Sequence, residues 1–359
     1  MSKAKNANKP MPNSNRKTIF VGIEGIGACN QFLMLPGTFS HLGNDYRLVT
    51  TEGKFSDHSP FDLVLRAGPN DHDLIKPSDV LFHKVKGKLV YLERLSKVEQ
   101  QSALYHAFDS YTDDIKFVDG FYNLGAHLIA DTGRFVSDHA LPDNIGGRSG
   151  YVIKPVGGAR SIGIMQFPST GTNIRLFIGR FTKLRSTMTD ISELVKLVSD
   201  FNGKINLGEA NHPTEVLDFF KDPDTKFLLQ NAAPNDVQEF RILKNGNNQL
   251  VVSERDHLKD SVNTFETTYG GLCDTDLEIK LGIHGCEDRT EILQGIEDFI
   301  RSSYFPMSHG SIDLWIDTSN SVMKWGIFEY QPQFNHAFIS DYICSNFLKD
   351  SLEQMYNAD

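Results

Sequence analysis

A lysine that ends an apolar run and is followed by a glycine-rich loop is the first group of residues able to do chemistry. Lys154 follows the run 151–153, which predicts a short strand. The loop after it contains Gly157, Gly158, Arg160, Ser161 and Gly163. Glycine lets backbone N–H groups approach an anion closely, while lysine, arginine and a hydroxyl add positive charge and a donor. The loop therefore suits a polyphosphate, although no Walker A pattern occurs; an ordinary surface loop is the alternative.

Two acids inside apolar strands form the second group. Asp313 lies in the run 311–316 and Glu329 in the run 325–330, with Gln331 two positions later. A carboxylate in such a strand costs free energy unless it is paired or binds a cation, and antiparallel pairing can bring two of them onto one face. Two carboxylates and an amide oxygen suit Mg²⁺, which also takes phosphate oxygens and water. The alternative is that strand alternation turns one or both acids toward solvent.

The third group is a pair of arginines on a predicted β-hairpin. Arg241 lies on the first strand and Arg255 follows on the second, with Asn245-Gly246 in the turn between them. Either guanidinium could bind phosphate oxygens or a substrate carboxylate through two parallel hydrogen bonds. Cross-strand ion pairs in solvent are the alternative.

Along the chain the lysine with its glycine-rich loop comes first, the arginine hairpin second and the two acids last. In that order the three groups resemble the ATP-grasp superfamily over roughly residues 115–345. Lys154 then corresponds to the nucleotide-binding lysine, and the glycine-rich loop to the loop that folds over the phosphates. Residues 227–233 resemble the hinge strand that meets adenine. Nucleotide contacts are thereby implied for Gln230, Asn231 and Ala232. Asp313 and Glu329 match the metal-binding acids, while Gln331 replaces the usual Asn.

The resemblance implies an enzyme that holds ATP and Mg²⁺ between two lobes. A substrate carboxylate would attack the γ-phosphate, and an amine or similar nucleophile would then displace phosphate from the acylphosphate. Arg241 would bind the transferring phosphoryl group or the substrate carboxylate, with Arg255 in support. A kinase that phosphorylates a hydroxyl is one alternative, and a nucleotide-binding or assembly protein without turnover is another.

The elements that must position these residues indicate an α/β and α+β fold. The resemblance implies a Rossmann-like N-terminal (pre-ATP-grasp) domain before a two-lobed ATP-grasp fold. The expected parts are a disordered tail (1–16), the N-terminal domain (17–95), a linker with helices (96–150), the small nucleotide-binding lobe (151–232) and the large catalytic lobe (233–359). Residues 168–188 resemble an insertion, either a basic rim over the cleft or solvated charge. Its basic residues are Arg175, Arg180, Lys183 and Arg185.

Hydrophobic periodicity and turn residues place the elements along the chain. Strands are predicted near 18–23, 63–65, 80–82, 88–92, 151–153, 227–229, 239–243, 250–252, 311–317 and 324–330. Helices are predicted near 97–109, 123–136, 190–201, 290–301 and 338–355. Asp190 and Glu193 have the spacing of a capping box at the start of the third of these helices.

Composition limits the partners. The chain has 359 residues, 40% of them hydrophobic, which indicates a globular protein of two or three domains. A net charge of −10 disfavours nucleic acid and anionic membrane surfaces, and no apolar run suits a spanning helix. Cys29, Cys273, Cys286 and Cys344 lack metal-ligand spacing. We therefore expect a cytoplasmic protein. The ATP-grasp resemblance implies small-molecule or peptide acids and amines as its substrates, with a homodimer as one option.

Overall fold

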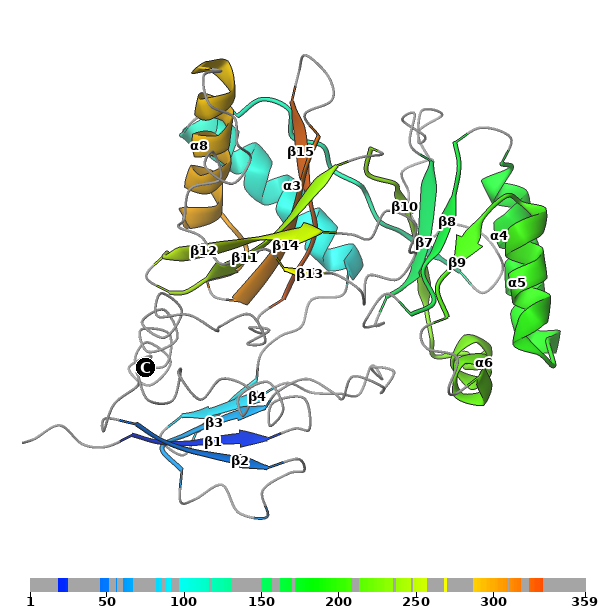
Figure 1. Ribbon diagram of the computed structural model, residues 1–359, viewed down its shortest axis with the longest axis horizontal. Coiled ribbons are helices and arrows are strands. Elements are labelled where there is room, and N and C mark those ends of the chain that lie inside the picture. Colours follow the sequence, from blue (N-terminus) through cyan, green and yellow to red (C-terminus); the bar gives the residue numbers. More distant parts are fainter. Residues whose placement is uncertain are drawn as a thin grey trace, which may run out of the picture.

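In the computed structural model, the described part of the chain forms three sheets of five strands each, and Figure 1 shows their arrangement. The structure describes residues 19–24, 46–51, 56, 61–66, 82–85, 88–91, 97–115, 118–130, 150–156, 162–169, 172–207, 213–234, 237–246, 248–256, 268–269, 287–308, 310–317 and 323–331. Within these ranges no helix is both long enough and apolar enough to cross a bilayer. The predicted tail, the predicted last helix and all four cysteines lie outside them.

The N-terminal sheet is mixed rather than fully parallel. Its strands are β1 (Ile19–Glu24), β2 (Tyr46–Thr51), β3 (Leu63–Arg66), β4 (Phe82–Val85) and β5 (Lys88–Tyr91), in the order β2-β1-β3-β4-β5. β1 runs parallel to β2 and β3, whereas β4 is antiparallel to both β3 and β5. Parallel strands need long crossovers, and the short gap between β4 and β5 forces a hairpin. The expected Rossmann-like domain is therefore not confirmed, and the described part of this region contains strands alone.

The second sheet is antiparallel, in the order β6-β10-β7-β8-β9. Its strands are β6 (His127–Ile129), β7 (Tyr151–Pro155), β8 (Met165–Phe167), β9 (Lys204–Ile205) and β10 (Phe227–Asn231). Three helices accompany it: α4 (Ile174–Thr187), α5 (Ile191–Asp200) and α6 (Pro213–Lys221). The capping box of α5 is present, as predicted. The predicted helix over 123–136 is wrong in its first half, because residues 127–129 pair with β10 as a strand.

Residues 168–188 contain a core helix, not only solvated charge. α4 buries Ile174, Phe177, Ile178 and Phe181 against the second sheet. Arg185 donates to the carbonyl oxygens of Phe220, Asp222 and Thr225 at 2.7, 2.7 and 2.8 Å. Its guanidinium also lies over the Phe227 ring, 4.8 Å from the centroid. Arg185 thus fixes the loop that leads from α6 into β10.

The third sheet is antiparallel, in the order β13-β12-β11-β14-β15. Its strands are β11 (Gln238–Lys244), β12 (Leu250–Asp256), β13 (Thr268–Tyr269), β14 (Gly310–Asp317) and β15 (Lys324–Gln331). α3 (Lys97–Asp114) and α8 (Glu287–Arg301) contribute to the core on one face of this sheet (Figure 1). α3 therefore packs with strands that lie some two hundred residues later in the chain.

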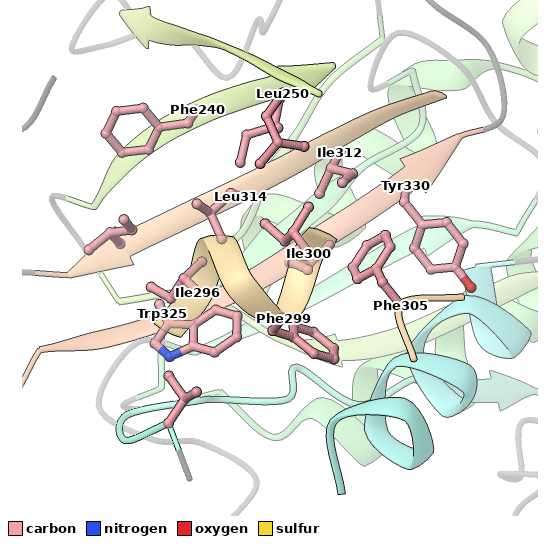
Figure 2. Close-up of a cluster of buried hydrophobic side chains, with 14 of the residues drawn as sticks. Phe240, Leu250, Ile296, Phe299, Ile300, Phe305, Ile312, Leu314, Trp325 and Tyr330 are labelled. Atoms are coloured by element: carbon pink, nitrogen blue, oxygen red, sulfur yellow. The ribbon is translucent and has the colours of Figure 1, made fainter. Parts of the chain in front are cut away.

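Strand alternation assigns one face of the third sheet to this core. Ile312 and Leu314 of β14 pack with Ile296 and Phe299 of α8 (Figure 2). Ile316 of β14 belongs to the same cluster. Burying each such side chain contributes about 1.5–3 kcal/mol. Because successive strand residues point to opposite faces, the odd-numbered residues of β14, Asp313 among them, belong to the other face. The candidate site is built on that second face.

Candidate functional site

Strand register brings Arg241, Asp313 and Glu329 into one row across the third sheet. Arg241 lies opposite Asp313, and Asp313 lies opposite Glu329. Arg241 Nε donates to Asp313 Oδ1 at 2.7 Å, and Arg241 Nη2 donates to Asp313 Oδ2 at 2.8 Å. Their side chains are only 11% and 8% exposed. The two acids thus share a face, and one of them is neutralised by a buried bidentate pair.

Lys97 joins this row from the first residue of α3. Its Nζ lies 3.6 Å from Glu329 Oε2, and the two side chains are 12% and 23% exposed. The sequence analysis missed Lys97, because a lysine at the start of a helix with no surrounding motif carries no signal. Only the tertiary contact between α3 and β15 reveals it.

Lys154 approaches the same acids from the second sheet. It lies on β7, opposite Leu228 of the hinge strand, and it is 7% exposed. Its pKa is lowered from 10.5 to about 7, mainly by burial and then by the positive charge of Lys97, while the charges of Glu329 and Asp313 act in the opposite direction. The two late acids thus act electrostatically on the mid-chain lysine, and we call these groups the electrostatic unit between the two sheets.

The hinge strand β10 uses most of its polar groups within the fold. Gln230 is buried, and its Nε2 donates to the carbonyl of Gly125 at 2.8 Å. The backbone N–H of Asn231 donates to Leu124 at 2.9 Å, and that of Ala232 donates to Gly150 at 3.0 Å. The Asn231 side-chain oxygen is buried and accepts no hydrogen bond from the described residues. It is the hinge atom best placed to accept a donor from a ligand.

The glycine-rich loop is described only at its end. Gly157, Gly158, Arg160 and Ser161 lie outside the described residues. Gly163 has φ +81°, which favours glycine, and its N–H donates to the carbonyl of Asn206 at 2.7 Å. That N–H is thus already engaged in holding the second sheet together.

Two further predicted residues are placed by backbone register only. Arg255 lies opposite Glu239, two positions from the partner of Arg241, and Gln331 lies opposite Ser311. Their side chains lie outside what the structure describes. Both therefore remain predictions.

The donor set fits a hard divalent cation through two carboxylates. Among the described residues, no group of three or more His, Cys, Asp or Glu side chains lies close enough to hold a metal ion. Mg²⁺ is commonly bound by only one or two carboxylates, with substrate phosphates as further ligands. Asp313 and Glu329 could supply these two carboxylates. Arg241 uses one lone pair of each Asp313 oxygen, so Asp313 can serve as a ligand through its remaining lone pairs or after that pair opens.

No family model and no curated protein matches the sequence. Among solved structures, the chain is similar to an L-amino acid ligase from Bacillus licheniformis, at 15% identity, covering 96% of this chain and 76% of that one, with a TM-score of 0.45. It is also similar to a D-alanine–D-alanine ligase from Bacillus anthracis, at 10% identity, covering 94% of each chain, with a TM-score of 0.42. These are ATP-grasp ligases.

A third similar structure is a macrocyclase from Microcystis aeruginosa, bound with its precursor peptide. The identity is 10%, the similarity covers 93% of this chain and 99% of that one, and the TM-score is 0.39. At these levels of similarity, the function of this chain must be argued from its own residues.

Proposed function

We propose that the protein is an ATP-dependent ligase that activates a carboxylate as an acylphosphate and joins it to an amine. The observation that supports the proposal is that Asp313 and Glu329, paired across the third sheet, act by their charge on the buried Lys154 of the second sheet. Positive groups on one side and two carboxylates on the other suit a triphosphate with its cation. The two-lobed ATP-grasp arrangement and its domain boundaries belong to the same proposal.

Each site residue has a distinct role in binding. Lys154 and Lys97 neutralise phosphate oxygens by charge, because a lysine ammonium acts as a compact donor. Asp313 and Glu329 would hold Mg²⁺, which supplies charge neutralisation on the β- and γ-phosphates. Asn231 accepts a hydrogen bond from the amino group of the base, using its unpartnered oxygen.

Arg241 takes part in the transfer step. Its guanidinium, held beside Asp313 by the bidentate pair, would bind the γ-phosphoryl oxygens or the substrate carboxylate. A carboxylate oxygen attacks the γ-phosphorus, the bond to the β-phosphate oxygen breaks, and ADP leaves. The amine then attacks the acyl carbon, phosphate leaves with the bonding electrons, and the amine loses a proton. The protein itself supplies orientation and charge rather than a nucleophile.

The test is release of ADP and phosphate from MgATP with panels of carboxylates and amines. Release of both products that requires an acid and an amine supports the ligase, whereas release of ADP without free phosphate, with a hydroxyl compound alone, supports the kinase. Glu329→Gln should lower turnover by about 10²–10³-fold, the usual cost of one preorganised electrostatic partner. Glu291→Gln, an exposed acid of α8, is the matched control and should leave turnover unchanged. Full activity in Glu329→Gln would remove this acid from the site.

A further inference from the structure

β15, the strand that carries Glu329, is the outer strand of its sheet among the described strands. Its outward backbone groups therefore need partners from elsewhere in the fold. At one end, the segment 120–122 supplies them: the N–H of Tyr122 donates to the carbonyl of Trp325 at 2.8 Å, and the N–H of Trp325 donates to Gly120 at 3.0 Å. Closer to Glu329, side chains of α3, instead of this segment, form hydrogen bonds with the outward backbone groups of β15.

Gln101 of α3 binds the irregular part of β15. The register with β14 passes from Glu329 to Ile327, which leaves Phe328 as an extra residue in a β-bulge. Gln101 Nε2 donates to the carbonyl oxygens of both Ile327 and Phe328, at 3.0 and 3.2 Å. One amide thus satisfies two consecutive carbonyls directly before Glu329.

Gln100 completes the arrangement on the other side of Glu329. Its Oε1 accepts the N–H of Tyr330 at 3.3 Å. Gln100 and Gln101 are each only 4% exposed. A buried amide without partners is costly, so both side chains are held firmly where the backbone of β15 receives them. Lys97, one turn earlier on the helix, contacts the Glu329 carboxylate itself.

The same helix turn is connected to the hinge strand by three further hydrogen bonds. Asn123 Nδ2 donates to the backbone oxygen of Gln101 at 3.2 Å. The N–H of Gly125 donates to Asn123 Oδ1 at 2.7 Å, and Gln230 Nε2 donates to the carbonyl of Gly125 at 2.8 Å. A continuous chain of hydrogen bonds therefore joins β10, where the base is proposed to lie, to β15.

We propose that Gln101 is a positioning residue: it fixes the bulge that aims Glu329 at the cation and ties that strand to the hinge strand. This inference rests on the proposed function, because it assumes that Glu329 binds the metal ion. Without the Gln101 amide, two buried carbonyls lose their donor and the bulge must rearrange, which displaces the next residue. Partners behind a metal ligand typically affect metal affinity about 10–100-fold.

The test compares ATP binding with and without Mg²⁺ in the full-length protein, measured by titration calorimetry. Gln101→Met keeps the side-chain length and removes the donor. We expect its ATP affinity in EDTA to stay within about twofold of wild type, while the gain in affinity given by Mg²⁺ falls about tenfold. Gln294→Met, the same substitution at an exposed position of α8, is the control and should change neither. A merely structural defect would weaken both affinities together.

Glu329→Gln, measured in parallel, separates this inference from the proposed function. If it keeps the full Mg²⁺ effect, the proposed metal site is wrong. If it loses the effect while Gln101→Met keeps it, only the role of Gln101 is overturned. If Gln101→Met does not fold, Asn123→Ala takes its place. This substitution removes the hydrogen bond to α3 at a half-buried residue, and we expect the same selective loss of the Mg²⁺ effect on ATP affinity. An unchanged Mg²⁺ effect in that variant also overturns the inference.

Discussion

Replacing Lys154 with methionine should change how the stability of the protein depends on pH. The pKa of Lys154 falls from 10.5 to about 7 in the folded protein. Since one unit of pKa corresponds to about 1.4 kcal/mol, keeping this buried lysine charged costs about 5 kcal/mol. Unfolding removes that cost.

The sign follows from proton binding. Between pH 7 and 10.5 the unfolded chain holds a proton on Lys154 that the folded chain has lost, so the free energy of unfolding rises with pH. The penalty is fully present below pH 7 and disappears as the pH rises toward 10.5. Between pH 6 and 9, the wild type should gain about 3 kcal/mol relative to Lys154→Met.

Urea unfolding of the nucleotide-free proteins at pH 6, 7, 8 and 9 measures this difference. Lys196→Met is the matched control, because Lys196 is an exposed lysine whose side chain is 75% accessible. Its stability difference from wild type should not vary over the same range. Parallel curves for wild type and Lys154→Met would refute the burial of this amine and with it the electrostatic unit between the two sheets.

Three further outcomes are expected. Asp313→Asn should destabilise the protein by about 3–5 kcal/mol, because it leaves the Arg241 guanidinium buried without its charge partner; an unchanged urea midpoint would contradict the pairing. Arg185→Met should cost about 2–4 kcal/mol in thermal unfolding, since three backbone carbonyls lose a charged donor, and a shift no larger than that of an exposed variant would argue against this role. Tyr330→Phe should be neutral or slightly stabilising, because the hydroxyl is buried without a partner among the described residues; a loss above about 1 kcal/mol would reveal a partner elsewhere.

Local patterns were sufficient to predict the strands and hairpins that carry the acids and Arg241. The alternation of β14 and the short turn before β15 restrict the register, so that Asp313 and Glu329 meet on one face. Their pairing with Arg241 required only the neighbouring strand. In this part of the chain, nearest-neighbour pairing and hydrophobic alternation determine the arrangement.

Contacts between distant segments could not be predicted in the same way. Lys97 and Gln101 lie more than two hundred residues before the strand that they contact, and nothing in a helix of mixed pattern marks their partners. The strand at 127–129 was mistaken for helix for the same reason, because only its pairing with β10 defines it. Such assignments depend on tertiary structure rather than on local propensity.

The segment 118–130 has a practical consequence for expressing parts of this protein. It pairs with β15 through Phe121 and then with β10 through β6, so one continuous stretch of backbone contributes to two sheets. A fragment that starts at Gly150 would leave an apolar edge of β10 uncovered and prone to aggregate. A fragment that starts after Tyr122 would already remove the backbone that borders β15. Truncations that separate the two sheets should therefore yield insoluble material on either side of the cut, whereas removal of residues before α3 spares both.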